Sequence, residues 1–216
     1  SLKFREPSGS NGMPPGPSIT KDGHALLLIN PPTSFFFRAA QPKPRDQGLN
    51  AYGASTWGQF FIYQGFNDNV GWMHTSTGAD TVDEFAETIV RKDGKLYYRY
   101  GAQLRPVTVS AITVPYRTPA GGMAAKTFTV YRTHHGPIVR AEGDKWIAMA
   151  LMNRPIAALE QSWGRTKTRD LASFLKVAEL DANSSNNTLF ADTKGETALL
   201  LPQFMPRRYN RFDYTK

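Results

Sequence analysis

The stretch GQFFIYQGFNDNVGW, residues 58–72, carries the strongest fold signal in this sequence. Gly58 to Phe66 is rich in aromatic and β-branched side chains, which favour β-strands. Asn67-Asp68-Asn69 follows with turn-forming residues, and Val70-Gly71-Trp72 continues the chain after the turn. The stretch therefore predicts a β-hairpin.

Further short β-rich segments, separated by Gly and Pro, lie on both sides of this hairpin. Upstream, Ala25 to Ile29 is an apolar run of strand length and predicts a buried strand. Downstream, Asp93-Gly94 marks a tight turn. The predicted downstream strands are Leu96–Tyr100, Val107–Val114, Thr127–Thr133, Ile138–Val139, Trp146–Leu151, Leu189–Ala191 and Thr197–Leu201. This rhythm is typical of antiparallel sheet.

Two segments carry a helical pattern. Apolar residues from Leu171 to Ala178 fall at i, i+3, i+4 and i+7 behind Thr168 as an N-cap, and they predict a helix. From Thr81 to Arg91 the apolar period also favours a helix, with Thr81 and Glu84 as a capping box. Many strands with a late helix predict a sheet-dominated α+β fold.

The composition is that of one compact globular domain. Hydrophobic residues make up 40% of the chain and charged residues 20%, and no run of eighteen apolar residues could span a membrane. Cysteine is absent, which excludes disulfides and thiolate metal sites. Because the chain begins Ser-Leu-Lys, with neither Met nor a leader, we expect it to be a piece of a longer product.

The net charge of +8 raises the question of a polyanionic partner. Arg207, Arg208 and Arg211 form the one basic cluster, and the other Lys and Arg residues are mixed with acids along the chain. A solvated basic surface is the favoured interpretation, so we expect neither nucleic acid nor a membrane as a partner. Polyanion binding through the arginine cluster stays the third-ranked hypothesis.

Common catalytic motifs are missing from the sequence. The four histidines lack the spacing of a zinc site, and no G-x-S-x-G elbow announces a Ser-His-Asp hydrolase. Neither a P-loop nor a dinucleotide fingerprint occurs, so no organic cofactor is expected.

Several blocks in a fixed order are more informative than any single motif. Together they resemble the β-chain of the penicillin acylase family over essentially the whole sequence. The blocks are Gly9-Ser10-Asn11-Gly12, Gly71-Trp72-Met73-His74-Thr75-Ser76, Asp80-Thr81-Val82-Asp83, Thr133-His134-His135-Gly136-Pro137, Asn186-Asn187-Thr188-Leu189-Phe190-Ala191-Asp192 and Pro206-Arg207-Arg208. The resemblance implies an N-terminal-nucleophile (Ntn) hydrolase, a four-layer αββα sandwich of which this chain is a sheet-dominated partial domain.

The resemblance makes Ser10 the catalytic nucleophile. Family precursors cut themselves between a glycine and a serine, and Gly9-Ser10 matches that junction. Residues 1–9 would then be the end of a spacer, and residues 10–216 the incomplete N-terminal part of the β-chain. The released α-amine, with a pKa of roughly 7.7–8.0, is a base poised near neutrality that can activate the serine hydroxyl.

The resemblance also assigns the groups around the nucleophile. The backbone N–H of Ser76, four residues after Trp72, and the side-chain amide of Asn187 would form the oxyanion hole. His135-Gly136-Pro137 would be a structural turn between strands. The substrate-pocket or support residues would be Asn11, Pro32, His74 and Arg208. The implied reaction is hydrolysis of an N-acyl small molecule.

Asp80, Val82 and Asp83 resemble the family's calcium loop, in which two carboxylates and a backbone carbonyl hold the ion. The resemblance therefore implies a structural calcium ion, and it turns Asp83 to Arg91 into a strand, against the helical period. It further implies an α-chain from the same precursor as partner, and a periplasmic or secreted location.

Three prolines depart from the family pattern. Relatives carry Asn-Pro-His or a Gln variant where this chain has Asn30-Pro31-Pro32, and Pro32 can donate no hydrogen bond to the nucleophile. Pro14 and Pro15 interrupt a segment that is a strand in relatives. The second hypothesis is therefore a non-catalytic remnant or binding domain. A run of phenylalanines can line an acyl pocket or fill the core: Phe35, Phe36, Phe37, Phe60 and Phe61.

Overall fold

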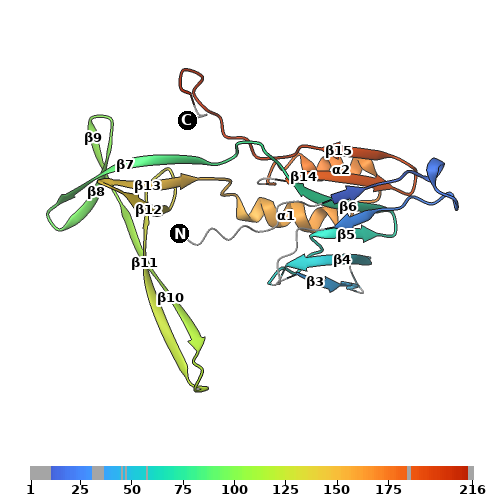
Figure 1. Cartoon of the computed structure of the whole chain (residues 1–216), viewed down its shortest axis with the longest axis horizontal. Helices are drawn as coiled ribbons and strands as arrows, with labels where there is room; N and C mark the ends of the chain where they lie inside the picture. The colour runs from blue at the N-terminus through green and yellow to red at the C-terminus, as the bar shows by residue number, and fades with distance from the viewer. Residues whose placement is uncertain are drawn as a thin grey trace. The chain divides into compact units, whose positions relative to one another are not determined.

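The computed structural model of the chain (Figure 1) describes residues 11–30, 37–44, 46, 48–56, 58–183 and 186–213. The expectations for Ser10, Pro32, Phe35, Phe36 and the spacer residues 1–9 lie outside these described residues. The chain divides into two compact units, one formed by Ser1–Thr81 with Met152–Lys216 and the other by Val82–Leu151.

The first unit contains a six-stranded sheet in the order β15-β14-β6-β5-β4-β3. All neighbouring strands in it are antiparallel. Its strands are β3 (Phe37–Ala40), β4 (Ala51–Thr56), β5 (Gln64–Asn67), β6 (Val70–Ser76), β14 (Asn186–Asp192) and β15 (Thr197–Leu200). The pairing of β6 with β14 extends from Val70 opposite Asp192 to Ser76 opposite Asn186. Both strands therefore reach the same end of the sheet.

The predicted hairpin is formed by β5 and β6. The Oδ1 atom of Asn67 accepts hydrogen bonds from the backbone N–H groups of Asn69 and Val70, each at 2.8 Å, so the turn is held by the side chain of its first asparagine. The predicted strand from Gly58 was too long, because pairing begins only at Gln64. Phe61 and Ile62 are buried in the loop before β5, so their apolar character serves the core rather than a ladder.

One face of the six-stranded sheet is covered by α1 (Pro155–Arg165) and α2 (Leu171–Ala178). Trp72 and Phe190 are fully buried on this face, and the Phe174 ring of α2 lies 4.9 Å from that of Phe190. Helix α2 was predicted, whereas α1 was not. Among the described residues, no helix combines the length and the hydropathy needed to span a bilayer.

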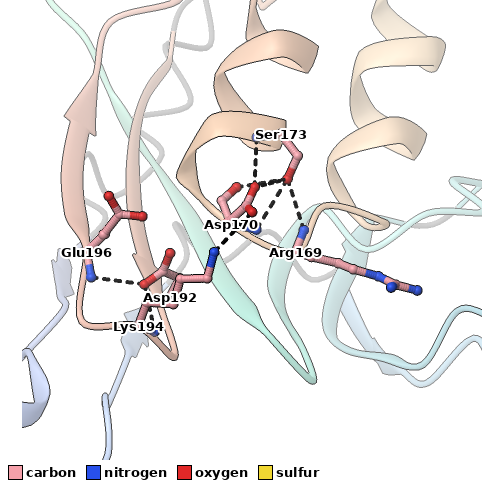
Figure 2. Close-up of polar contacts among 6 residues, drawn as sticks. All are labelled: Arg169, Asp170, Ser173, Asp192, Lys194 and Glu196. Atoms are coloured by element: carbon pink, nitrogen blue, oxygen red, sulfur yellow. Dashed lines mark hydrogen bonds and ion pairs between the residues drawn. The ribbon is translucent and has the colours of Figure 1, made fainter.

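Helix α2 begins at a cap that also fixes the end of the β14–β15 hairpin (Figure 2). The N-cap is Asp170 rather than the predicted Thr168; its carboxylate accepts from the Ser173 backbone N–H at 2.9 Å in a capping box. Lys194, in the turn after β14, places its Nζ atom 3.2 Å from Asp170 Oδ2. The buried Asp192 carboxylate accepts the backbone N–H groups of Lys194 and Glu196.

The other face of the sheet is covered by a small ribbon of β1 (Asn11–Met13) and β2 (Leu28–Asn30). A Cβ on Gly12 would lie 1.6 Å from Met73 Sδ, and one on Gly71 would lie 2.5 Å from a Leu27 methyl group. Met73 and Gly71 point away from the helices because side chains alternate across a strand. The two glycines therefore let the ribbon approach β6 closely.

The expectation of a buried strand from Ala25 to Ile29 was wrong in extent and in burial. Pairing with β1 begins only at Leu28, and the Leu28 side chain is exposed. A short 3₁₀ helix, η1 (Pro17–Ile19), lies between β1 and β2. Strand β1 itself ends at Met13, immediately before Pro14, as the missing proline N–H requires.

The second unit consists of a five-stranded antiparallel sheet, β12-β13-β7-β8-β9, and a separate two-stranded ribbon, β10-β11. Strand β7 pairs with both β13 and β8, which corrects the helical interpretation of Thr81 to Arg91 and confirms the strand implied by the resemblance. The strands are β7 (Asp83–Lys92), β8 (Lys95–Tyr100), β9 (Gln103–Pro106), β10 (Thr108–Arg117), β11 (Met123–Arg132), β12 (Ile138–Glu142) and β13 (Lys145–Ala150).

The His-Gly-Pro block is a turn between β11 and β12. Gly136 has φ 152°, and a Cβ there would lie 1.9 Å from the Met149 carbonyl oxygen, so only glycine fits. His135 Nδ1 lies 2.8 Å from the buried Glu87 carboxylate, and its ring stacks on Phe85 at 3.8 Å. These contacts agree with the structural role that the resemblance implies.

Candidate active site

Ser76 and Asn187, the two predicted oxyanion groups, lie side by side at the end of the β6–β14 ladder. Asn187 is opposite Thr75, and its Nδ2 donates to Thr75 Oγ1 at 3.2 Å and to the Ser76 carbonyl oxygen at 3.4 Å. The Asn187 amide therefore lies against the backbone at Ser76. Residues more than a hundred positions apart in the sequence meet here because two antiparallel strands end together.

The amide of Asn187 is oriented by a residue that sequence reasoning missed. Gln203 Nε2 donates to Asn187 Oδ1 at 2.9 Å and to the Asn186 carbonyl oxygen at 3.2 Å. With its oxygen engaged by Gln203, Asn187 directs its Nδ2 toward β6, where Thr75 Oγ1 and the Ser76 carbonyl oxygen accept its two N–H groups. A substrate oxyanion would replace one of these two acceptors. A hydrogen-bond donor with a fixed direction is what an oxyanion hole needs.

His74 lies on the opposite face of β6 from Thr75 and is fully buried. Its Nδ1 lies 3.0 Å from Thr188 Oγ1, so it braces β14 next to Asn187. Burial first and the charge of Arg165 second hold the pKa of His74 well below its usual value. A neutral imidazole that contacts β14 fits the predicted supporting role.

Arg208 and Asp80, predicted for different roles, contact each other. Arg208 Nη1 lies 3.0 Å from Asp80 Oδ2, with the arginine mostly buried and the carboxylate half-exposed. Arg208 therefore contacts the same carboxylate that the resemblance assigns to calcium. The described part of the chain contains no group of three or more His, Cys, Asp or Glu side chains able to hold a metal ion. Calcium binding stays a prediction.

The other two predicted calcium ligands, Val82 and Asp83, belong to the second unit. Val82 is exposed, and Asp83 opens β7.

Strand β1 follows a defined course along β6. Leu27, which lies beyond the Met13–Leu28 pair, packs on Gly71, and Gly12 packs on Met73. Moving toward the start of β1 thus means moving along β6 from Gly71 toward Thr75. Asn11, the first residue of β1, is exposed, is paired with Asn30 and is bonded to Ser10.

A cavity of about 440 Å³ lies at the same end of the sheet as Ser76 and Asn187. Asn186, which faces Ser76 across the ladder, forms part of its wall and donates to Tyr63 Oη at 2.8 Å. Burial raises the pKa of the Tyr63 hydroxyl, an effect opposed by the charge of Arg165. Of the phenylalanines considered for an acyl pocket, Phe61 lines this cavity, whereas the largely exposed Phe60 does not.

Helix α1 supplies much of this cavity, and a sequence signal for it exists. Pro155 stands at the first helical turn, where its missing N–H costs nothing, and Ile156, Leu159 and Trp163 follow at helical spacing. Gln203 and Arg165 carry no comparable signal, since nothing in the local sequence says which side chain each will meet.

Comparison with known proteins adds independent findings. A family model described as penicillin amidase matches residues 2–215. Acyl-homoserine lactone acylase QuiP of Pseudomonas fluorescens is 30% identical over 133 residues, which cover 62% of this chain and 16% of that protein. Acyl-homoserine lactone acylase PvdQ of Pseudomonas putida is 29% identical over 218 residues, which cover 94% of this chain and 28% of that protein.

A solved structure shares the fold. Thermostable penicillin G acylase from Alcaligenes faecalis superposes with a TM-score of 0.70 and 20% identity, over 95% of this chain and 36% of that one. The likeness confirms the expected fold class, an Ntn-hydrolase αββα sandwich of which this chain forms a sheet-dominated part. The chain thus spans between 16% and 36% of the length of these relatives.

Proposed function

Because the chain belongs to the penicillin amidase family, we propose that it forms the nucleophile-bearing part of an amidohydrolase that cleaves N-acyl amide bonds. The named relatives are acylases, which supports hydrolysis of an amide as the reaction class. The single observation that carries the proposal is the meeting of Ser76 and Asn187 at the end of the ladder, beside the strand that Ser10 precedes.

The chemistry follows from these groups. Cleavage between Gly9 and Ser10 turns an amide nitrogen into a free amine, which takes the Ser10 hydroxyl proton through a water molecule as Oγ attacks the amide carbon. The Ser76 N–H and Asn187 Nδ2 stabilise the resulting oxyanion, a contribution of about 2.7–4 kcal/mol for one such donor. The amine product leaves with a proton, and water hydrolyses the acyl-enzyme to the free acid and Ser10.

The course of β1 supports Ser10 as the nucleophile. A strand advances by about 3.3 Å per residue, and both β1 and β6 are extended. The described contacts carry the start of β1 along β6 toward Thr75, on the sheet face to which the Asn187 side chain belongs. This course of β1 supports the assignment of the nucleophile to the residue that precedes Asn11 in the sequence.

The remaining parts of the proposal come from the family. An α-chain from the same precursor would complete the substrate site, and the protein would act in the periplasm or outside the cell. Co-purification of a second chain that starts upstream of Gly9, together with cell fractionation, tests both points.

Turnover is the direct test of the proposed function. The complete gene product is assayed against a panel of N-acyl amides with acyl chains of different lengths, and release of the amine is measured. We expect at least one substrate to be hydrolysed, and we expect Asn187→Ala to lower kcat on the order of 10²–10³-fold.

The control variant is Asn50→Ala. Asn50 also donates a hydrogen bond from its side-chain amide, to Asp68 Oδ1 at 3.1 Å, but this contact lies at the β5–β6 turn, away from the Ser76 end of β6. Asn50→Ala should keep wild-type kcat. A panel on which neither the wild-type protein nor its Pro32→His variant shows turnover would favour the second hypothesis, a non-catalytic domain with the acylase fold.

A further inference from the structure

Arg165 lies at the C-terminal end of α1 with only 6% of its surface exposed, and it lines the cavity beside Asn186. Its Nη2 donates to Ser162 Oγ at 3.1 Å, and its buried Nε has no hydrogen-bond partner among the described residues. Burial lowers the pKa of Arg165 to about 10, so the guanidinium is still charged at neutral pH. A buried cation with an unsatisfied donor needs an explanation.

No carboxylate of the described residues forms an ion pair with Arg165. Glu6 is the one acidic side chain outside the described ranges, and by resemblance it belongs to the spacer. Burying a charge without a counter-ion costs several kcal/mol. Arg165 lies at the wall of a cavity, where a ligand carboxylate could reach the guanidinium and act as its counter-ion.

The cavity has the size and lining of a small-molecule site. It measures about 440 Å³, and its apolar wall is formed by residues such as Phe61, Pro155 and Leu159. A planar guanidinium binds a carboxylate through two parallel hydrogen bonds, and such pairing is strongest where water is excluded. The wall also contains polar side chains, among them Gln59, Gln161 and Asn183, and Arg165 is the one charged residue among the described residues that line it. Such a cavity fits a short aliphatic chain that ends in a carboxylate.

We propose that the cavity lined by Arg165 binds a carboxylate, and that the substrate of this protein carries that carboxylate on the part of the molecule that enters the cavity. The assignment to a substrate rests on the proposed function, whereas carboxylate binding itself does not. Asn186 lines the cavity on the helix-covered face of the sheet, whereas the side chain of the next residue, Asn187, lies on the face of the β1–β2 ribbon. A substrate that occupies both sites would therefore pass around the end of the β6–β14 ladder.

Direct binding tests the site without any turnover. Pentanoate and pentanamide have the same shape and differ in charge, and each is titrated into the complete gene product by calorimetry. We expect pentanoate to bind on the order of tenfold more tightly than pentanamide, and Arg165→Met to abolish this preference. Equal binding of the two probes, or a preference that survives in Arg165→Met, would overturn the proposal.

Arg169→Met is the matched control, since Arg169 is exposed four residues further along and does not line this cavity. It should bind pentanoate as the wild type does. Arg165→Met should also unfold at the same or a higher temperature than wild type, because it removes an uncompensated buried charge. If that variant fails to fold, Arg165→Lys replaces it, because lysine keeps the charge but lacks the planar guanidinium. Arg165→Lys should show a reduced preference for pentanoate over pentanamide. An undiminished preference in this variant counts against the site.

Two substrate series then distinguish the possible sources of the carboxylate. One carries it at the end of the acyl chain of a neutral amine, and the other carries it on the amine, as in an N-acyl amino acid. We expect one series to be hydrolysed faster than its uncharged analogues by wild type but not by Arg165→Met. Carboxylate binding without any turnover would refute the proposed function and leave the binding site standing. Turnover without a preference for charge would support the proposed function and overturn the assignment of the carboxylate to the substrate.

Discussion

The Nε2 atom of Gln203 donates a 2.9 Å hydrogen bond to Oδ1 of Asn187, and this contact fixes which way the Asn187 amide faces. Without this hydrogen bond, the Asn187 amide could rotate, and its oxygen would then face the reacting carbonyl and repel the developing negative charge. Gln203 therefore acts as a positioning residue for the proposed oxyanion hole.

Gln203→Leu should lower kcat on the order of tenfold while KM changes little, because the lost interaction matters mainly in the transition state. Steady-state kinetics on the best substrate of the panel measures both constants. Gln41→Leu is the control, since Gln41 makes a comparable amide contact, to Asn50 at 3.2 Å, at an exposed position. An equal loss in both variants would show that Gln203 has no special role.

Gly12→Ala should destabilise the first unit, because the new Cβ would lie 1.6 Å from Met73 Sδ in a fully buried position. Overpacking of this kind costs about 1–3 kcal/mol, softened here by the flexibility of methionine. Urea unfolding measures the loss. Gly16→Ala is the control, since nothing lies within 4 Å of a Cβ there and φ is −70°; an identical loss in both would contradict the close approach of β1 to β6.

His74 makes stability depend on pH below about 6.5. Because its pKa is lowered in the folded state, the unfolded chain binds the proton first, so the free energy of unfolding falls as pH drops below the unfolded value of 6.5. One such group contributes a slope of up to about 1.36 kcal/mol per pH unit.

The slope is measured by urea unfolding at several pH values below 6.5. His74→Gln should flatten it without removing it, since the pKa of His134 is lowered too, chiefly by partial burial. A His74→Gln variant with the wild-type slope would mean that His74 titrates normally in the folded protein.

Asp80, which pairs with Arg208 and is also a predicted calcium ligand, allows a test of the calcium prediction. If the ion binds there, a calcium chelator should lower the unfolding temperature of the wild-type protein, and Asp80→Asn should no longer respond. Differential scanning calorimetry with and without chelator gives the comparison. The exposed Asp68→Asn, on the β5–β6 turn, is the control; no response in wild type would leave Asp80 only as the partner of Arg208, 3.0 Å away.

The sequence pattern predicted those structural elements that are determined by residues close to one another in the chain. The β5–β6 turn at Asn67, the tight turn at Asp93-Gly94 and the apolar period of α2 all follow from neighbouring residues. Strand β7 shows the opposite case, because its period is helical and only pairing with β13 and β8 makes it a strand. The pairing with β13 joins residues 57 to 67 positions apart, so it leaves no mark in the local period.

The residues of the candidate site also divide into those that the sequence could predict and those that it could not. Ser76 and Asn187 were found through family blocks, and the structure brings them together. Gln203 and Arg165 were missed because each is defined by the residue it meets in space, Asn187 for one and an open cavity for the other. Contacts between distant residues have no sequence signature of their own.

The central claim is that Ser10 becomes the N-terminal nucleophile, and intact mass spectrometry of the freshly expressed complete gene product tests it most directly. The account predicts a chain that begins at Ser10 and a Ser10→Ala variant that stays uncut. An unbroken bond between Gly9 and Ser10 in the wild-type protein, with the Ser10→Ala variant identical to it, would contradict the account.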